Sequence, residues 1–172
     1  MAPAPPMETG VPVEVELFLA TLGPGESVRY FRKTAPLRRS ANPDDVVGAL
    51  RRPDPTDGFF LPEPALVHST SWRWEPHGGL VLTYLAFGDE VRPGKGAPHE
   101  LGKHELVGSG PTHPLRPRPE VLREVHVFTH ALRHVALLLS RPKEEALRAR
   151  FSARSLEFFR GLEPAPAGRL WR

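Results

Sequence analysis

The sequence predicts a single α+β domain, in which an antiparallel or mixed sheet is covered by two C-terminal helices. Short strand-like segments between Gly and Pro turns fill the first two thirds of the chain, and helical periodicity is strongest after residue 120. Strands first and helices last is the order typical of α+β domains. With 172 residues the chain can bury one core. We expect a flexible tail at 1–12, the domain at 13–163 and a C-terminal tail at 164–172.

The composition narrows the class of protein. The chain is 40% hydrophobic and 25% charged, and it has no cysteine, which excludes disulfides and thiolate chemistry. No segment approaches the roughly 18 apolar residues that span a bilayer, and the N-terminus lacks an apolar signal-peptide core. We therefore expect a cytoplasmic protein without a membrane partner. Arg outnumbers Lys by 19 to 4, a bias that indicates a GC-rich bacterial genome.

The charge is uneven along the chain. Residues 116–172 contain 12 Lys and Arg against 6 Glu, whereas the remainder contains 11 against 14 acidic residues. A basic half suits an acidic partner, but solvated arginine-rich helix faces explain the same excess. Aromatic residues are not interleaved with these arginines as base stacking requires, so nucleic acid is not expected.

The first elements are a hairpin and a short helix. Segment 13–22 fits both strand alternation and a helical face, but the Gly-Pro-Gly turn and the strand-like segment 27–33 after it favour a hairpin. Asn42 is then a good helix N-cap, with Pro43 at the first helical position. This helix must end before Pro53, and residues 51–58 form a loop.

The clearest strand pair is 65–75 with 80–87, joined by a Pro-His-Gly-Gly turn. Alternation places His68, Thr70 and Trp72 on one face of the first strand and Arg73 on the other. The second strand is apolar on both faces, which predicts an interior position. Residues 91–98 read as a loop, 101–107 as a further strand and 108–119, with four prolines, as an extended connector.

Two helices are predicted to close the chain, at 120–139 and 142–162. His126, His130 and His134 recur every four residues in the first, so their rings share a stripe about 80° wide. Arg123 and Arg133 flank this stripe, and no carboxylate lies on it. The opposite side is the core face, formed by Leu122, Val125, Phe128, Leu132, Val135 and Leu139.

Three interpretations of the histidine stripe compete. As a metal site, His130 and His134 are spaced for two ligands on one ion, but the Glu of HExxH is absent. As an anion site, the histidines and Arg133 bind a phosphate or carboxylate and offer acid–base chemistry. As a packing surface, the histidines only cover the edge of the core. Isolated sequence patterns of this type are more often packing than active sites.

Our functional hypothesis places a small anionic ligand between the sheet and this helix. The sheet contributes His68, Thr70 and Arg73, and the helix contributes His126, His130, Arg133 and His134. The alternatives are a non-enzymatic protein-interaction module with basic C-terminal helices and a metal-dependent hydrolase with His130 and His134 as ligands. The chain has no Walker A, GxGxxG or GxSxG motif. The sequence does not identify a cofactor, a catalytic residue or an oligomeric state.

Overall fold

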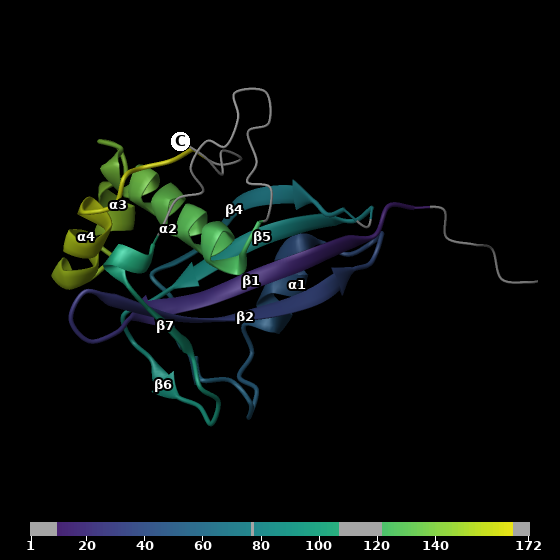
Figure 1. Cartoon of the computed structure of the whole chain (residues 1–172), viewed down its shortest axis with the longest axis horizontal. Helices are drawn as coiled ribbons and strands as arrows, with labels where there is room; N and C mark the ends of the chain where they lie inside the picture. The colour runs from purple at the N-terminus through teal and green to yellow at the C-terminus, as the bar shows by residue number, and fades with distance from the viewer. Residues whose placement is uncertain (1–9, 77, 107–121, 167–172) are drawn as a thin grey trace, which may run out of the picture.

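The computed structural model describes residues 10–76, 78–106 and 122–166. These residues form the predicted α+β domain, in which a mixed five-stranded sheet has the order β4-β5-β1-β2-β7 (Figure 1). A separate ladder pairs β3 with β6. None of the helices in these ranges is long and apolar enough to cross a membrane. The strands are β1 (Val13–Leu22), β2 (Ser27–Leu37), β3 (Phe59–Phe60), β4 (Leu66–Trp74), β5 (Leu80–Phe87), β6 (Arg92–Pro93) and β7 (His99–Gly102); the helices are α1 (Pro43–Leu50), α2 (Glu124–Ser140), α3 (Glu145–Arg148) and α4 (Ala153–Arg160).

β1 is the middle strand of the sheet. It pairs antiparallel with β2 through a turn in which Gly25 has φ 60°, and parallel with β5. Every residue from Val15 to Leu22 is buried, and apolar side chains lie on both faces of the strand. This explains why the sequence of β1 also fits the spacing of an apolar helix face. The predicted hairpin is confirmed. β5 has the predicted interior position, between β4 and β1.

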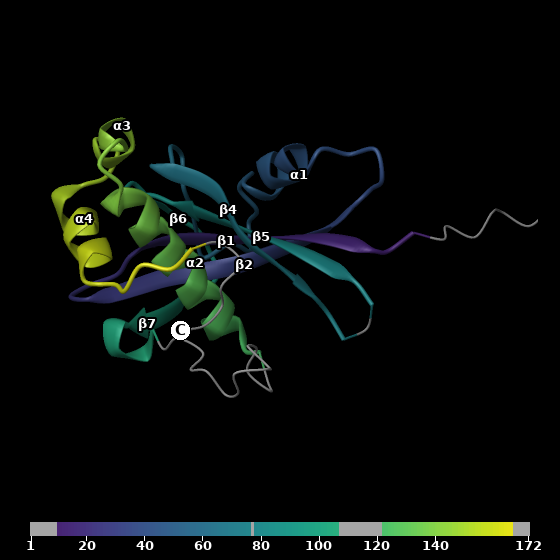
Figure 2. The ribbon, with the colours of Figure 1, turned by 90° about the horizontal axis from the view of Figure 1, so that it is seen from above.

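The sheet separates two apolar cores. On one face, α2 and α4 pack over a cluster that includes Phe18 and Phe87. On the other face, α1 packs over a smaller cluster that includes Leu17 and Val47. Figure 2 shows α1 and α2 on opposite sides of β1 and β2. We refer to the two surfaces of the sheet as the α2 face and the α1 face.

A β-bulge in β4 makes the predicted faces of this strand wrong. Strict alternation puts His68 and Arg73 on opposite faces, but the register with β5 shifts between Ser69 and Ser71. The extra residue brings Arg73 to the α2 face together with His68, and it turns Trp72 outward, where it is 59% exposed. Two of the predicted site residues therefore share a face only because of the bulge.

The C-terminal helices differ from the prediction in number. α2 begins at Glu124, and residues 120 and 121 of the predicted helix lie outside the described residues. The predicted helix 142–162 is two helices, α3 and α4. Ser152 has extended backbone angles and caps α4, because its hydroxyl accepts the Ser155 N–H and its own N–H donates to Asp89 at 2.8 Å. Ser152 therefore begins a new helix, and the helix predicted to run continuously from 142 to 162 is interrupted before this residue.

Smaller differences concern the loops and the tails. The strand predicted at 101–107 is β7 at His99–Gly102, followed by a short 3-10 turn at Lys103–Glu105. The connector 108–119 lies outside the described residues, as do residues 1–9 of the N-terminal tail and 167–172 of the C-terminal tail. Ala165, in the predicted C-terminal tail, is 8% exposed. Packing therefore continues at least to this residue.

The loops next to β3 and β6 contact each other backbone to backbone. Gly96 N–H donates to the Asp57 carbonyl at 2.9 Å, and a Cβ on Gly96 would lie 2.1 Å from the Thr56 carbonyl oxygen. We expect Gly96→Ala to lower the free energy of unfolding by more than about 1 kcal/mol, since the backbone must move. Gly48→Ala in α1 meets open space and should raise it by about 0.5 kcal/mol. Urea unfolding measures both values, and changes of equal sign would contradict this account.

Candidate functional site on the α2 face

The α2 face holds a buried network of ionised groups around Glu16 of β1. Glu16 is 1% exposed and accepts two hydrogen bonds from Arg73 of β4, from Nη1 to Oε2 at 2.6 Å and from Nη2 to Oε1 at 3.0 Å. Arg32 of β2 pairs through Nε with Oε1 at 2.6 Å, and Thr83 of β5 donates from Oγ1 to Oε2 at 2.9 Å. One carboxylate thus connects four strands, and its hydrogen bonds compensate for its burial.

The same network reaches the first turn of α2. Arg32 Nη1 lies 3.6 Å from Glu124 Oε2, and the Tyr30 hydroxyl donates to Glu124 Oε1 at 3.1 Å. Burial, followed by the charge of Glu124, raises the pKa of Tyr30, so its hydroxyl stays protonated. Arg73 Nε also pairs with Glu75 at 2.6 Å. Among the described residues, three carboxylates against two guanidinium groups leave no net positive charge here for an anionic ligand.

Internal partners therefore occupy two of the three side chains predicted to bind from the sheet. Arg73 belongs to the Glu16 network, and Thr70 is fully buried in the bulge with its hydroxyl donating to the Thr83 carbonyl at 3.3 Å. The third, His68, is half-buried and faces α2. Of the three, His68 is the side chain that is open to a ligand.

His68 and His134 meet where β4 contacts the second half of α2. Their rings are stacked, with centroids 5.4 Å apart and planes 13° from parallel. Burial, followed by the charge of Arg141, lowers the pKa of His68. Burial also lowers the pKa of His134, with smaller contributions from His68 and Arg141, although a hydrogen bond to the Ala165 carbonyl opposes the shift. Both rings are therefore neutral at pH 7.

The hydrogen bond of His134 fixes its tautomer. Nδ1 lies 3.3 Å from the Ala165 carbonyl oxygen, which only accepts, so Nδ1 carries the hydrogen of the neutral ring. Nε2 of His134 then has a free lone pair. In this state the ring accepts a proton at Nε2, as a general base or on binding an acidic ligand.

The other two histidines of the stripe have different environments. His130 is 3% exposed, and its Nε2 is buried without a hydrogen-bond partner in the part of the chain that the structure describes. Burial, followed by the charges of His134 and Arg133, lowers its pKa to about 4. His126 is half-buried at the start of α2, where its Nδ1 accepts the N–H of Arg123 at 3.2 Å. His126 therefore caps the helix and lies apart from the stacked pair.

The side of α2 that carries Arg133 and His134 packs against the segment that follows α4. Arg133 Nε donates to the Glu163 carbonyl at 2.8 Å, and its Nη2 pairs with the Glu163 carboxylate at 2.7 Å. The Ala165 N–H donates to the Arg133 carbonyl at 3.1 Å. Together with the bond from His134, these contacts hold residues 163–165 across the stripe. The packing interpretation therefore accounts for Arg133 and for one side of His134.

Arg141, which the sequence analysis did not single out, completes the stacked pair. It is exposed just after α2, close enough for its charge to lower the pKa of both His68 and His134. Within the described ranges, no carboxylate forms an ion pair with its guanidinium group. At 100° per residue, position 141 falls at about 60° on the wheel, between His130 and His134. The stripe, continued past the end of the helix at the same angle, therefore includes Arg141.

The two alternative hypotheses, an interaction surface on the basic C-terminal helices and a metal site, receive less support from the structure. Besides Arg133, three described arginines of the basic C-terminal half donate to main-chain carbonyls: Arg148 to residues 139, 141 and 142, Arg150 to Pro64, and Arg154 to Gly23 and Gly25. They hold the helices to the rest of the fold. Over residues 10–76, 78–106 and 122–166, no three His, Asp or Glu side chains are arranged to hold a metal ion.

Fold and site together define an α+β domain with a buried ion network in its sheet and a neutral imidazole pair beside it. No family of known proteins, curated protein or solved structure matches this chain. The site must therefore be interpreted from its own geometry.

Proposed function

We propose that this protein binds a small anionic ligand at the contact between β4 and α2, through His68, His134 and Arg141. The observation that carries the proposal is the stacked His68–His134 pair, 5.4 Å between ring centroids, with the Arg141 charge beside it. Compared with the sequence hypothesis, the ligand set is narrower. Thr70, Arg73 and Arg133 have internal partners, His126 caps α2, and His130 is buried.

The charges at this contact suit a phosphate or carboxylate. The guanidinium group of Arg141 offers a full positive charge and several N–H donors. The two imidazoles are neutral because burial and Arg141 oppose their protonation, and a bound anion would offset both effects. Ligand binding is therefore coupled to proton uptake by the imidazoles, so the affinity for a ligand whose own charge is constant, such as a carboxylate, should rise as pH falls from 7 towards 6. The same coupling allows acid–base chemistry on the ligand.

The test is binding of inorganic phosphate at pH 6, measured by isothermal titration calorimetry. We expect His68→Asn to weaken binding about tenfold and Arg141→Gln about threefold, the losses typical of a charged hydrogen bond and of an exposed charge. His126→Asn is the matched control, since it removes an imidazole of the same stripe outside the pair, and should bind like the wild type. Equal affinity in His68→Asn and wild type would reject the site.

A further inference from the structure

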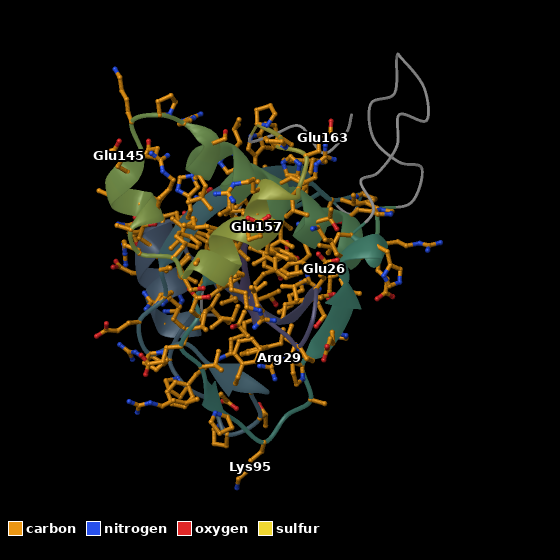
Figure 3. The ribbon with its side chains drawn as sticks, turned by 90° about the vertical axis from the view of Figure 1, so that its left-hand side faces the viewer. Glu26, Arg29, Lys95, Glu145, Glu157 and Glu163 are labelled. Atoms are coloured by element: carbon orange, nitrogen blue, oxygen red, sulfur yellow. The ribbon has the colours of Figure 1, made fainter. Side chains whose placement is uncertain are left out.

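A hollow of about 200 Å3 lies beside the last turns of α2, between them, α3, α4 and the segment that follows α4. It exists because the chain bends between α3 and α4, so that α3 lies at the end of α2 and α4 along its side. Figure 3 looks onto this part of the molecule, where Glu157 marks α4 and Glu163 marks the segment after it. The hollow is separate from the His68–His134 contact, because none of its lining residues belongs to that contact.

The walls of the hollow are mainly apolar. α2 contributes Ala136 and Leu139, α4 contributes Leu156 and Phe159, and Leu162 follows α4. Ala136 and Phe159 are also members of the core on the α2 face, so these walls are held rigidly by packing. An apolar hollow with a few polar groups at its edge is the usual form of a small-molecule site.

Two arginines, Arg148 and Arg160, line the same hollow. Arg148 uses three of its five N–H groups on carbonyls at the end of α2, and no carboxylate in the described part of the chain forms an ion pair with it. Arg160 pairs with Glu157 at the surface, where both side chains are more than 70% exposed. Among the described residues, the lining therefore carries two positive charges and no negative one, and Glu157, outside the lining, offsets the charge of Arg160.

We propose that this hollow binds a small free carboxylate with an apolar body the size of one aromatic ring, with its carboxylate towards Arg148 and Arg160. A dry cavity of about 150 Å3 accommodates benzene, so 200 Å3 suits a ring with a short acidic side chain. A ligand of about ten heavy atoms at ordinary efficiency gives a dissociation constant on the order of millimolar.

The experiment compares phenylacetate with phenylacetamide, which has the same shape but no charge. Amide shifts of the 15N-labelled full chain are followed by NMR as each compound is added. We expect saturable shifts at Phe159 and Leu162 with phenylacetate, and affinity for phenylacetamide at least threefold lower, as loss of an exposed charge interaction implies. Equal affinities would overturn the role of the arginines, and shifts only at other residues would overturn the site.

Three variants separate the apolar and charged parts. Ala136→Met fills the hollow and should abolish the shifts, whereas unchanged binding would reject the site; circular dichroism checks that the variant folds. Glu157→Gln frees the Arg160 charge and should tighten phenylacetate binding about twofold without changing phenylacetamide binding. Lys143→Gln, which removes a charge outside the lining, is the control and should bind like the wild type. Weaker phenylacetate binding in Glu157→Gln would contradict the predicted orientation.

Discussion

Replacing Glu16 by Gln should destabilise the protein by about 3 kcal/mol or more, because breaking a buried ion pair by removing one partner costs roughly 3–5 kcal/mol. Gln keeps the size of the side chain but removes the buried negative charge beside the Arg73 guanidinium, whose side chain is 9% exposed, and leaves the more exposed Glu75 as its remaining ion-pair partner among the described residues. Arg32 loses its 2.6 Å contact at the same time. Urea unfolding monitored by far-UV circular dichroism measures the change.

The matched control is Glu157→Gln. This change removes the same group from an ion pair with Arg160 that is over 70% exposed on both sides, and it should leave the unfolding midpoint unchanged. A double-mutant cycle of Glu16→Gln with Arg73→Gln adds a second criterion. Since both single variants disrupt one network, the double variant should cost clearly less than their sum. Additive effects would contradict the network as the source of stability.

Acidification should destabilise the protein through His130. Its pKa is about 4 in the folded protein and about 6.5 in an unfolded chain, so between these values the unfolded state binds more protons. Stability from this group is therefore complete above pH 6.5 and is lost as pH falls. The expected loss between pH 7 and pH 5 is about 2 kcal/mol.

The variant His130→Leu isolates this effect from those of other titrating groups. Leu has no group to protonate and removes the Nε2 that has no hydrogen-bond partner among the described residues, so at pH 7 the variant should lie within about 1 kcal/mol of the wild type. At pH 5 it should then be the more stable protein by roughly 1–2 kcal/mol. Parallel pH profiles of the two proteins would show that His130 is not held neutral by burial.

The sequence was a good guide wherever local chemistry determines the structure. Asn42 and Pro43 define the start of α1, and the Gly-rich turns define both hairpins. It was a poor guide where a single residue changes which face of a strand the next side chains occupy, or interrupts a helix. The extra residue at the β4 bulge reverses the face of Arg73, and the Ser152 cap divides a helical pattern that continues on both sides.

The candidate site likewise has one part that the sequence predicts and one part that it does not. The four-residue spacing of His126, His130 and His134 correctly indicates one side of a helix. Whether a polar side chain on that side is available depends on contacts across the chain that spacing does not encode. Arg133 is paired with Glu163, thirty residues later, and His134 with His68 on the sheet. Such pairing is set by tertiary packing, so the sequence offered Arg133 as a ligand and omitted Arg141.

The most direct test of the anion site is the pKa of the His68 ring, measured by NMR with and without inorganic phosphate. Without phosphate, we expect a value below the usual 6.5, because burial and Arg141 disfavour the imidazolium. With saturating phosphate the pKa of His68 should rise by about one unit, the amount linked to tenfold tighter binding by the protonated ring. His126, outside the pair, should titrate identically in both samples. A His68 pKa that phosphate leaves unchanged would contradict the proposal that the His68–His134 contact binds anions.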